Sequence, residues 1–239
     1  MKLVTFGCSW TRGIGIPYYK GMSREEYEKT KKTNKEEMDK YSFRGILSER
    51  LGYTNINFSC GGSSNQRQFR FAREYFNHNS KEDTVVLWGI TSVARNEIVV
   101  DGMWRNFLYT HKIGSLRWIP QETHNFFLEN YDEQLAITNL QDEMLHWNQF
   151  FEAYNIPNLW FQTFNTYKLE VDRLFPRDIL SHLTRPMFRD THESNWSVDS
   201  KRISEAERKG LVNPYSLHPT KETHIKIADI LEKPLREIL

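Results

Sequence analysis

The chain has few cysteines and no long apolar segment. Cys8 and Cys60 are the two cysteines among 239 residues, so the sequence offers no disulfide framework and favours a reducing compartment with free thiols. No stretch approaches the roughly 20 consecutive apolar residues that a membrane-spanning helix needs. The opening residues, MKLVTFGCSW, lack the apolar core of a signal peptide. We therefore expect a cytoplasmic protein with no membrane partner.

An excess of charge of either sign is also missing. Lys and Arg total 32, Asp and Glu total 31, and the formal net charge is +1. Proteins that bind nucleic acids usually carry a basic excess or a basic stripe. No nucleic-acid partner is therefore expected.

Several motifs of large enzyme families are absent. The sequence has no Gly-x-Ser-x-Gly elbow, which argues against the α/β-hydrolase family. It has no Walker A loop and no complete dinucleotide fingerprint, because Gly13-Ile14-Gly15 lacks the third glycine. The eight histidines form no His-x-x-x-His pair and the two cysteines lie far apart, so we expect no metal site and no cofactor.

The apolar content is enough for a substantial core. Hydrophobic residues make up 38% of the chain and aromatic residues 14%, which suits a single large domain over residues 1–239. Short apolar runs predict buried strands at 2–7, 54–59, 84–91 and 158–164. Helical patterns lie at 43–51, 64–77, 132–154 and 220–239. Strands that alternate with helices predict an α/β protein, with a central parallel sheet covered on both faces.

Two segments do not fit this alternation and are interpreted as insertions. Residues 17–42 are rich in Lys, Glu and Tyr, which favours a solvated helical excursion over a lid. Residues 98–131 hold Trp104, Phe107, Tyr109, Trp118, Phe126 and Phe127 among others, with little periodicity. They predict a long loop, either covering a satellite core or carrying function. This second segment follows the third predicted strand, at the edge where open α/β sheets bind ligands.

Ser9 is the first candidate for chemistry. It lies in Gly7-Cys8-Ser9-Trp10-Thr11, directly after the first strand, where a tight turn would present its hydroxyl at the sheet edge and leave backbone amides free to donate to an oxyanion. The alternative is a serine that only caps a helix. Cys8 is a second possible nucleophile, but adjacent residues on a turn point differently and we expect Cys8 to face the core.

Two further signals follow along the chain. The segment Ser59-Cys60-Gly61-Gly62-Ser63-Ser64-Asn65 comes after the second strand, and its glycines either let a backbone amide approach a ligand or only shape the turn. The segment Leu217-His218-Pro219-Thr220 opens the last helix and brings a histidine to its start.

The order of these three signals resembles the SGNH hydrolase superfamily, the GDSL esterases and lipases. The resemblance implies a flavodoxin-like three-layer α/β/α fold with Ser9 as the nucleophile and His218 as the base. It also implies that the amide of Gly62 serves an oxyanion hole. The stretch SLHPTKETHIKIADIL looks like the family's last block.

The sequence departs from the family pattern in the residues around this site. Cys8 stands where the family usually has Asp. Thr91 stands where the family supplies an Asn to the oxyanion hole, and either its hydroxyl or nearby Asn65 could donate instead. Tyr215 stands three residues before His218, where the family has the Asp that orients the histidine.

The missing Asp leaves three alternatives open. An acid could come from Asp199, Glu205 or Glu207 if the preceding segment folds back. A Ser-His dyad could work with a backbone carbonyl or Asn213 orienting the ring. Catalysis could also have been lost, since removal of the Asp costs a serine protease about 10⁴ in turnover.

The resemblance implies a serine esterase that acts on a small, acetyl-like ester through an acyl-enzyme. Trp10 and the aromatic residues of 98–131 would suit stacking on a sugar, which favours a small-molecule or carbohydrate ester. Arg95 is a candidate to bind a carboxylate or phosphate, or else a surface residue that pairs with Glu97. The alternatives are an O-acetyltransferase and a non-catalytic binding or structural protein on the same fold.

Overall fold

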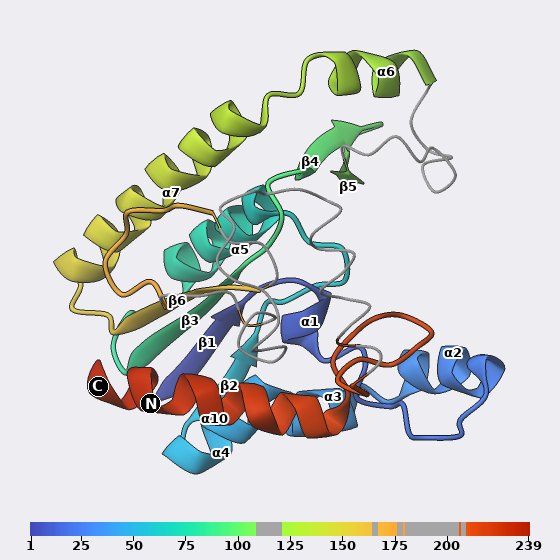
Figure 1. The fold of residues 1–239 in the computed structure, drawn as a ribbon. Helices are drawn as coiled ribbons and strands as arrows, with labels where there is room; N and C mark the ends of the chain where they lie inside the picture. Colours follow the sequence, from blue (N-terminus) through green and yellow to red (C-terminus); the bar gives the residue numbers. More distant parts are fainter. Residues whose placement is uncertain (109–120, 164–166, 176–178, 180–205, 207–208) are drawn as a thin grey trace.

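The computed structural model describes residues 1–108, 121–163, 167–175, 179, 206 and 209–239 (Figure 1). The strands are β1 (Lys2–Phe6), β2 (Thr54–Asn57), β3 (Thr84–Ile90), β4 (Arg95–Val100), β5 (Met103–Leu108) and β6 (Asn158–Gln162). The helices are α1 (Ser9–Arg12), α2 (Arg24–Thr33), α3 (Lys35–Tyr41), α4 (Phe43–Leu51), α5 (Asn65–His78), α6 (Gln121–Glu129), α7 (Glu133–Ala153) and α10 (Lys221–Glu237). None of the helices within these ranges is long and apolar enough to cross a membrane.

The central sheet has four parallel strands in the order β2-β1-β3-β6. Strand β1 lies in the middle, where Val4 is opposite Ile56 on β2 and Val86 on β3. The expected parallel sheet is therefore confirmed. Because all four strands run the same way, the loops that follow β1, β2 and β3 leave the sheet at one edge.

Alternate residues of the strands pack into two separate cores, one on each face of the sheet. On β3, Val86 and Trp88 face one core while Val85 and Leu87 face the other. The first core is completed by side chains of α5 and α7, and the second by side chains of α4 and α10. Figure 1 shows these helix pairs on opposite sides of the sheet. The three-layer α/β/α architecture follows from this two-sided burial.

The structure corrects the prediction of a long loop over residues 98–131. Strands β4 and β5 form an antiparallel hairpin in which Val100 is opposite Met103. The turn residues Asp101 and Gly102 both have positive φ, 51° and 71°, as a two-residue type I′ hairpin requires. The Asp-Gly pair was the sequence signal for this hairpin. Helix α6 follows, and Tyr109 and Trp118 lie outside the described residues.

We predict that Leu87→Ala lowers the free energy of unfolding by about 3 kcal/mol, because it opens a cavity in a fully buried strand position. The matched control is Leu145→Ala on α7, whose side chain is 39% exposed. This change should alter stability by less than about 0.5 kcal/mol. Denaturant unfolding followed by circular dichroism measures both, and equal losses would contradict the assignment of the core.

Candidate active site

Ser9 is the first residue of the short helix that follows β1. Cys8 occupies the N-cap position and Gly13 ends the helix, where its backbone N–H donates to the carbonyls of Ser9 and Trp10. Ser9 is therefore not the N-cap residue, which was the alternative role for it. Its side chain is 6% exposed and lines a cavity of about 610 Å³.

The neighbours of Ser9 point into the protein. Cys8 is fully buried, as expected, and packs in a small cluster with Trp10, Leu211 and Val212. Trp10 is 5% exposed. This burial leaves little of the ring free to stack on a sugar, and that role for Trp10 stays a prediction.

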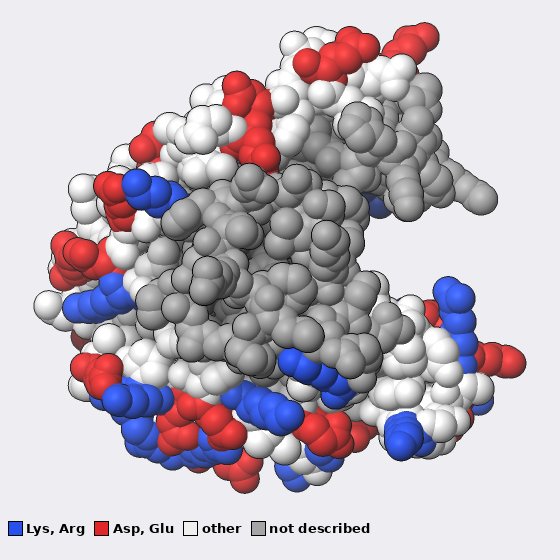
Figure 2. All heavy atoms as spheres, in the orientation of Figure 1, with Lys and Arg blue, Asp and Glu red and all other residues white. Residues whose placement is uncertain are grey.

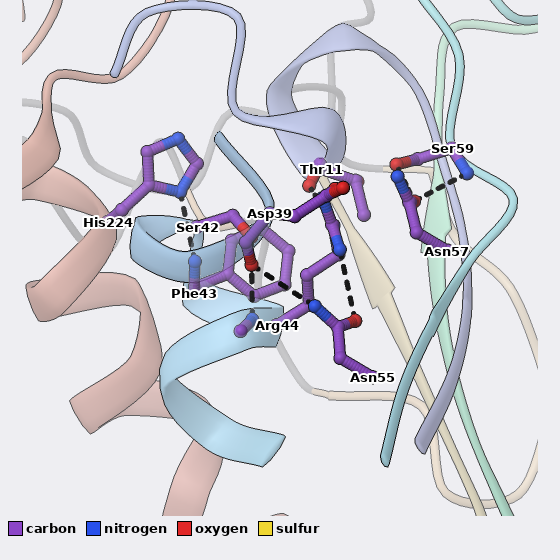
Figure 3. A network of polar contacts seen from close by, with 10 residues as sticks. Thr11, Asp39, Ser42, Phe43, Arg44, Asn55, Asn57, Ser59 and His224 are labelled. Carbon is purple, nitrogen blue, oxygen red and sulfur yellow. Dashed lines mark hydrogen bonds and ion pairs between the residues drawn. The ribbon is translucent and has the colours of Figure 1, made fainter. Parts of the chain in front are cut away.

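A buried arginine ties α1 to the elements around it (Figure 3). Arg44, on α4, is fully buried and donates from Nε to the backbone carbonyl of Thr11 over 3.3 Å. It also donates to Asn55 on β2 and forms an ion pair with Asp39 on α3. The helix that carries Ser9 is thus anchored to three other elements. Sequence reasoning missed this residue because a charged side chain inside an apolar helical pattern is normally exposed.

The glycine loop after β2 lies against the end of β1. The backbone N–H of Cys60 donates to the carbonyl of Gly7 over 3.1 Å. Gly62 has φ of 68°, a left-handed conformation that side chains rarely adopt, and an added Cβ would point into open space. Gly62 lines the same cavity as Ser9.

Asn65 and Thr91 are paired with each other and do not line this cavity. The Nδ2 of Asn65 donates to the carbonyl of Thr91, and the N–H of Thr91 donates to the Oδ1 of Asn65, each over 3.0 Å. Both residues are buried. The pair joins the start of α5 to the end of β3. A donor role for either residue in an oxyanion hole stays a prediction.

His218 lies in a tight loop between two short extended segments. Val212 pairs with Pro219 in an antiparallel bridge, and the N–H of Asn213 donates to the carbonyl of His218 over 2.8 Å. Leu217, just before the histidine, has φ of 56°. A non-glycine residue in this region costs of order 1–3 kcal/mol, and such strain tends to gather at functional sites.

Two contacts hold the His218 loop against the turn that follows Ser9. A Cβ added to Gly15 would lie 2.1 Å from the carbonyl oxygen of Pro219 and 2.7 Å from that of His218, so only glycine permits this approach. The hydroxyl of Tyr27, on α2, also bridges the two segments. It donates to the carbonyl of Ile14 and lies 2.8 Å from the Oγ of Ser216.

The residue at the family's Asp position does not reach the histidine. The hydroxyl of Tyr215 donates to the carbonyl of Met22 over 2.7 Å, which attaches the loop to the 17–42 insertion. The side chain of Asn213 bonds to the N–H groups of Tyr215 and Ser216 and to the Ser216 hydroxyl. Neither side chain therefore orients His218.

The Nδ1 atom of His218 is buried and has no regular hydrogen bond within the part of the chain that the structure describes. The backbone carbonyl of Ser216 interacts with the ring and raises its pKa. The alternative of a dyad whose ring is oriented by a backbone carbonyl stays a prediction. The acids that could have served instead, Asp199, Glu205 and Glu207, lie outside the described residues.

Burial, together with smaller effects of the positive charges of Arg95 and Lys31, lowers the pKa of His218 from 6.5 to about 4. Burial and these charges together outweigh the Ser216 carbonyl, which raises the pKa. The ring is therefore neutral at neutral pH. A neutral imidazole has a nitrogen free to accept a proton, as a general base must.

The cavity brings together residues from both ends of the chain. Ser9, Gly62, Arg95 and His218 all line it, together with Arg12, Ile14, Lys31, Lys32, Lys35, Met38, Gly61 and Ser216. Its volume is within the usual range for small-molecule sites. Residues 17–42 supply part of its wall, which corrects the prediction that this insertion is only a solvated excursion. No feature of the sequence placed these lysines at the site.

Arg95 is the first residue of β4 and lines the cavity. Glu97, its expected surface partner, accepts two hydrogen bonds from the guanidinium of Arg70, at 3.0 and 2.9 Å, and is nearly buried. The carboxylate of Glu97 is thus engaged with α5. Among the residues that the structure describes, no cluster of His, Cys, Asp and Glu could hold a metal ion.

Comparison with known proteins gives a likeness at the level of the fold. No family model and no curated protein matches the chain. One similar solved structure is a protein assigned to the lipolytic G-D-S-L family from Desulfitobacterium hafniense. Its TM-score is 0.40 at 12% identity, over 98% of each chain.

Two similar structures are larger enzymes. One is a carbohydrate esterase described as having divergent catalytic and non-catalytic binding functions, with a TM-score of 0.49 at 11% identity over 99% of this chain and 68% of that chain. The other is a carbohydrate esterase family 2 enzyme with a carbohydrate-binding domain from Myceliophthora fergusii. Its TM-score is 0.47 at 11% identity, over 99% of this chain and 66% of that chain.

The structural neighbours are G-D-S-L lipolytic proteins and carbohydrate esterases. The resemblance stated from the three sequence motifs agrees with them. At 11–12% identity the likeness says nothing about substrate or mechanism. Only the residues that line the cavity bear on those.

We predict that Tyr27→Phe lowers the free energy of unfolding by about 1 kcal/mol, because it removes the hydroxyl that bonds to the Ile14 carbonyl and to the Ser216 hydroxyl. The matched control is Tyr53→Phe, whose ring packs against the second core. Thermal unfolding of the two variants measures the difference. A loss in Tyr53→Phe as large as in Tyr27→Phe would contradict the bridging role.

We predict that His218 titrates near pH 4 in the folded protein. Since the pKa lies below the unfolded value of about 6.5, the unfolded chain binds more protons between these two values. The free energy of unfolding should therefore fall as the pH drops from about 6.5 to 4. Nitrogen-15 NMR of the histidine rings, assigned with His218→Gln, measures the pKa. A midpoint near 6.5 would show that the ring is not desolvated.

Proposed function

We propose that this protein is a serine esterase whose nucleophile is Ser9 and whose general base is His218. The observation that carries the proposal is that these two residues, from opposite ends of the chain, line one cavity together with Gly62. The cavity volume suits a small-molecule or carbohydrate ester. The lowered pKa of His218 keeps its ring neutral at physiological pH, so a ring nitrogen is free to accept a proton.

In the proposed first step, the Oγ of Ser9 attacks the ester carbonyl carbon while His218 accepts the hydroxyl proton. The bond from this carbon to the alcohol oxygen then breaks, and His218 returns the proton to the leaving alkoxide. The backbone amides of Ser9 and Gly62 donate to the oxyanion. Asn65 and Thr91 support this arrangement by holding the end of β3 to α5.

In the second step, water attacks the acyl group on Ser9. His218 takes a proton from this water and passes it to the Oγ of Ser9 as the acid leaves. Because no carboxylate lies at Nδ1 among the described residues, the Ser216 carbonyl and the constrained 211–220 loop orient the imidazole in this mechanism. Because the third member of a triad contributes strongly to turnover, we expect a slow enzyme on unactivated esters.

A second candidate function is ligand binding without catalysis on the same fold. It is favoured by one observation, the lack of a carboxylate near Nδ1 of His218 among the described residues. Such a protein would keep the cavity and bind an ester without cleaving it. The two candidates differ in whether Ser9 is an activated nucleophile.

We predict that a fluorophosphonate probe forms a single adduct on Ser9, detected by mass spectrometry of the intact protein and of its peptides. Labelling should disappear in Ser9→Ala and fall about 10³-fold or more in His218→Ala, since the two residues act as a unit. The matched control is Cys8→Ala, which removes the adjacent buried thiol and should keep the adduct. Absence of an adduct, with a correctly folded protein, would favour the binding function.

A further inference from the structure

The charged side chains that line the cavity are all of one sign within the part of the chain that the structure describes. They are Arg12, Lys31, Lys32, Lys35 and Arg95, and no Asp or Glu joins them. The chain as a whole has a net charge of only +1. Over α4 and α10, basic and acidic side chains are interspersed (Figure 2). The positive lining is therefore a local feature of the site.

These cations come from three separate parts of the fold. Arg12 ends the helix that Ser9 begins, and Arg95 begins the hairpin after β3. Lys31 and Lys32 lie in the last turn of α2, and Lys35 begins α3. Positively charged side chains therefore line the cavity both from the edge of the sheet and from the 17–42 insertion.

Among the described residues, ion pairs with acidic side chains engage only part of this charge. Lys31 forms an ion pair with Glu28 over 2.7 Å, which lowers the pKa of that carboxyl. The charge of Lys32 acts on Glu28 as well. Within the described ranges, Arg12 and Lys35 have no ion-pair partner. Gathering like charges around a cavity is unfavourable unless something of opposite charge enters it.

We infer that the substrate is a small ester that carries a carboxylate or a phosphate, and that Arg95 and Arg12 with the lysines of α2 and α3 bind this anion. The inference rests on the proposed function, because it places the anion beside an ester held at Ser9. An arginine fork matches the two oxygens of either group. The lysines add charge without fixed geometry, which suits attraction of an anion from solution.

The test compares three esters that share an acetyl group on an aromatic ring and differ in the substituent para to the ester oxygen. Phenyl acetate is neutral, 4-acetoxybenzoate carries a carboxylate, and 4-acetoxyphenyl phosphate carries a phosphate. We expect kcat/KM at pH 8 to be at least about tenfold higher for one of the anionic esters. At this pH His218 is neutral whether or not Arg95 is present. The preferred anion identifies the group.

The variants locate the effect. Arg95→Met should reduce the ratio of anionic to neutral kcat/KM about tenfold, and the pair Lys32→Met with Lys35→Met should reduce it about threefold. The matched control is Lys29→Met, an exposed lysine of α2 that does not line the cavity. It should keep the wild-type ratio. Raising the salt concentration from 50 to 500 mM should also reduce the ratio, since salt screens exposed charges.

The outcomes separate this inference from the proposed function. Hydrolysis of phenyl acetate at an equal or higher rate, with the Ser9 adduct present, overturns the anionic substrate and leaves the esterase. If no ester is cleaved, calorimetric titration with phenyl phosphate, 4-hydroxybenzoate and phenol tests whether the cavity binds an anion. Binding of an anion but not phenol, lost in Arg95→Met and kept in Lys29→Met, supports the anion site in a non-catalytic protein. Equal binding of the anions and of phenol, or no binding of any of them, overturns the anion site.

Discussion

Parallel pairing of β1 with both β2 and β3 is the constraint on which the rest of the site depends. It sends the segments after all three strands out of the same edge of the sheet. Ser9 follows β1, Gly62 follows β2 and Arg95 follows β3, so residues far apart in the sequence line one cavity. Ligands in open α/β sheets generally lie at such an edge.

The second requirement is that the C-terminal histidine reaches this edge. Gly15 allows the turn after α1 to touch the backbone of His218 and Pro219, and Tyr27 links the same two segments through hydrogen bonds. The 17–42 insertion therefore has two effects. It fastens the His218 loop through Tyr27 and Met22, and it adds lysines to the wall of the cavity.

The electrostatics of the site follow from the same packing. Enclosure of His218 removes the water that would stabilise its protonated form, and nearby cations add to this effect. The imidazole of His218 is thus kept neutral without a carboxylate partner among the described residues. The same cations give the cavity a charge complementary to an acid group. A neutral histidine and a positively charged wall are two consequences of one arrangement.

The secondary structure could largely be predicted from the sequence, because its causes are local. The four predicted strands and four predicted helices appear at their expected places. The second strand ends early, at Asn57, because the Oδ1 of that residue accepts the N–H of Ser59 and turns the chain. The β4–β5 hairpin was missed because its Asp-Gly turn was overlooked within an aromatic-rich segment.

The sequence by itself determined the fold class and the identity of the candidate residues at the strand ends. Apolar periodicity and turn chemistry act over a few residues, so they can be recognised without a structure. Only the tertiary structure decided that Ser9 and His218 share a cavity, that Tyr215 bonds to Met22, and that lysines of an insertion line the site. These contacts join segments far apart in the chain, and they depend on how the layers pack.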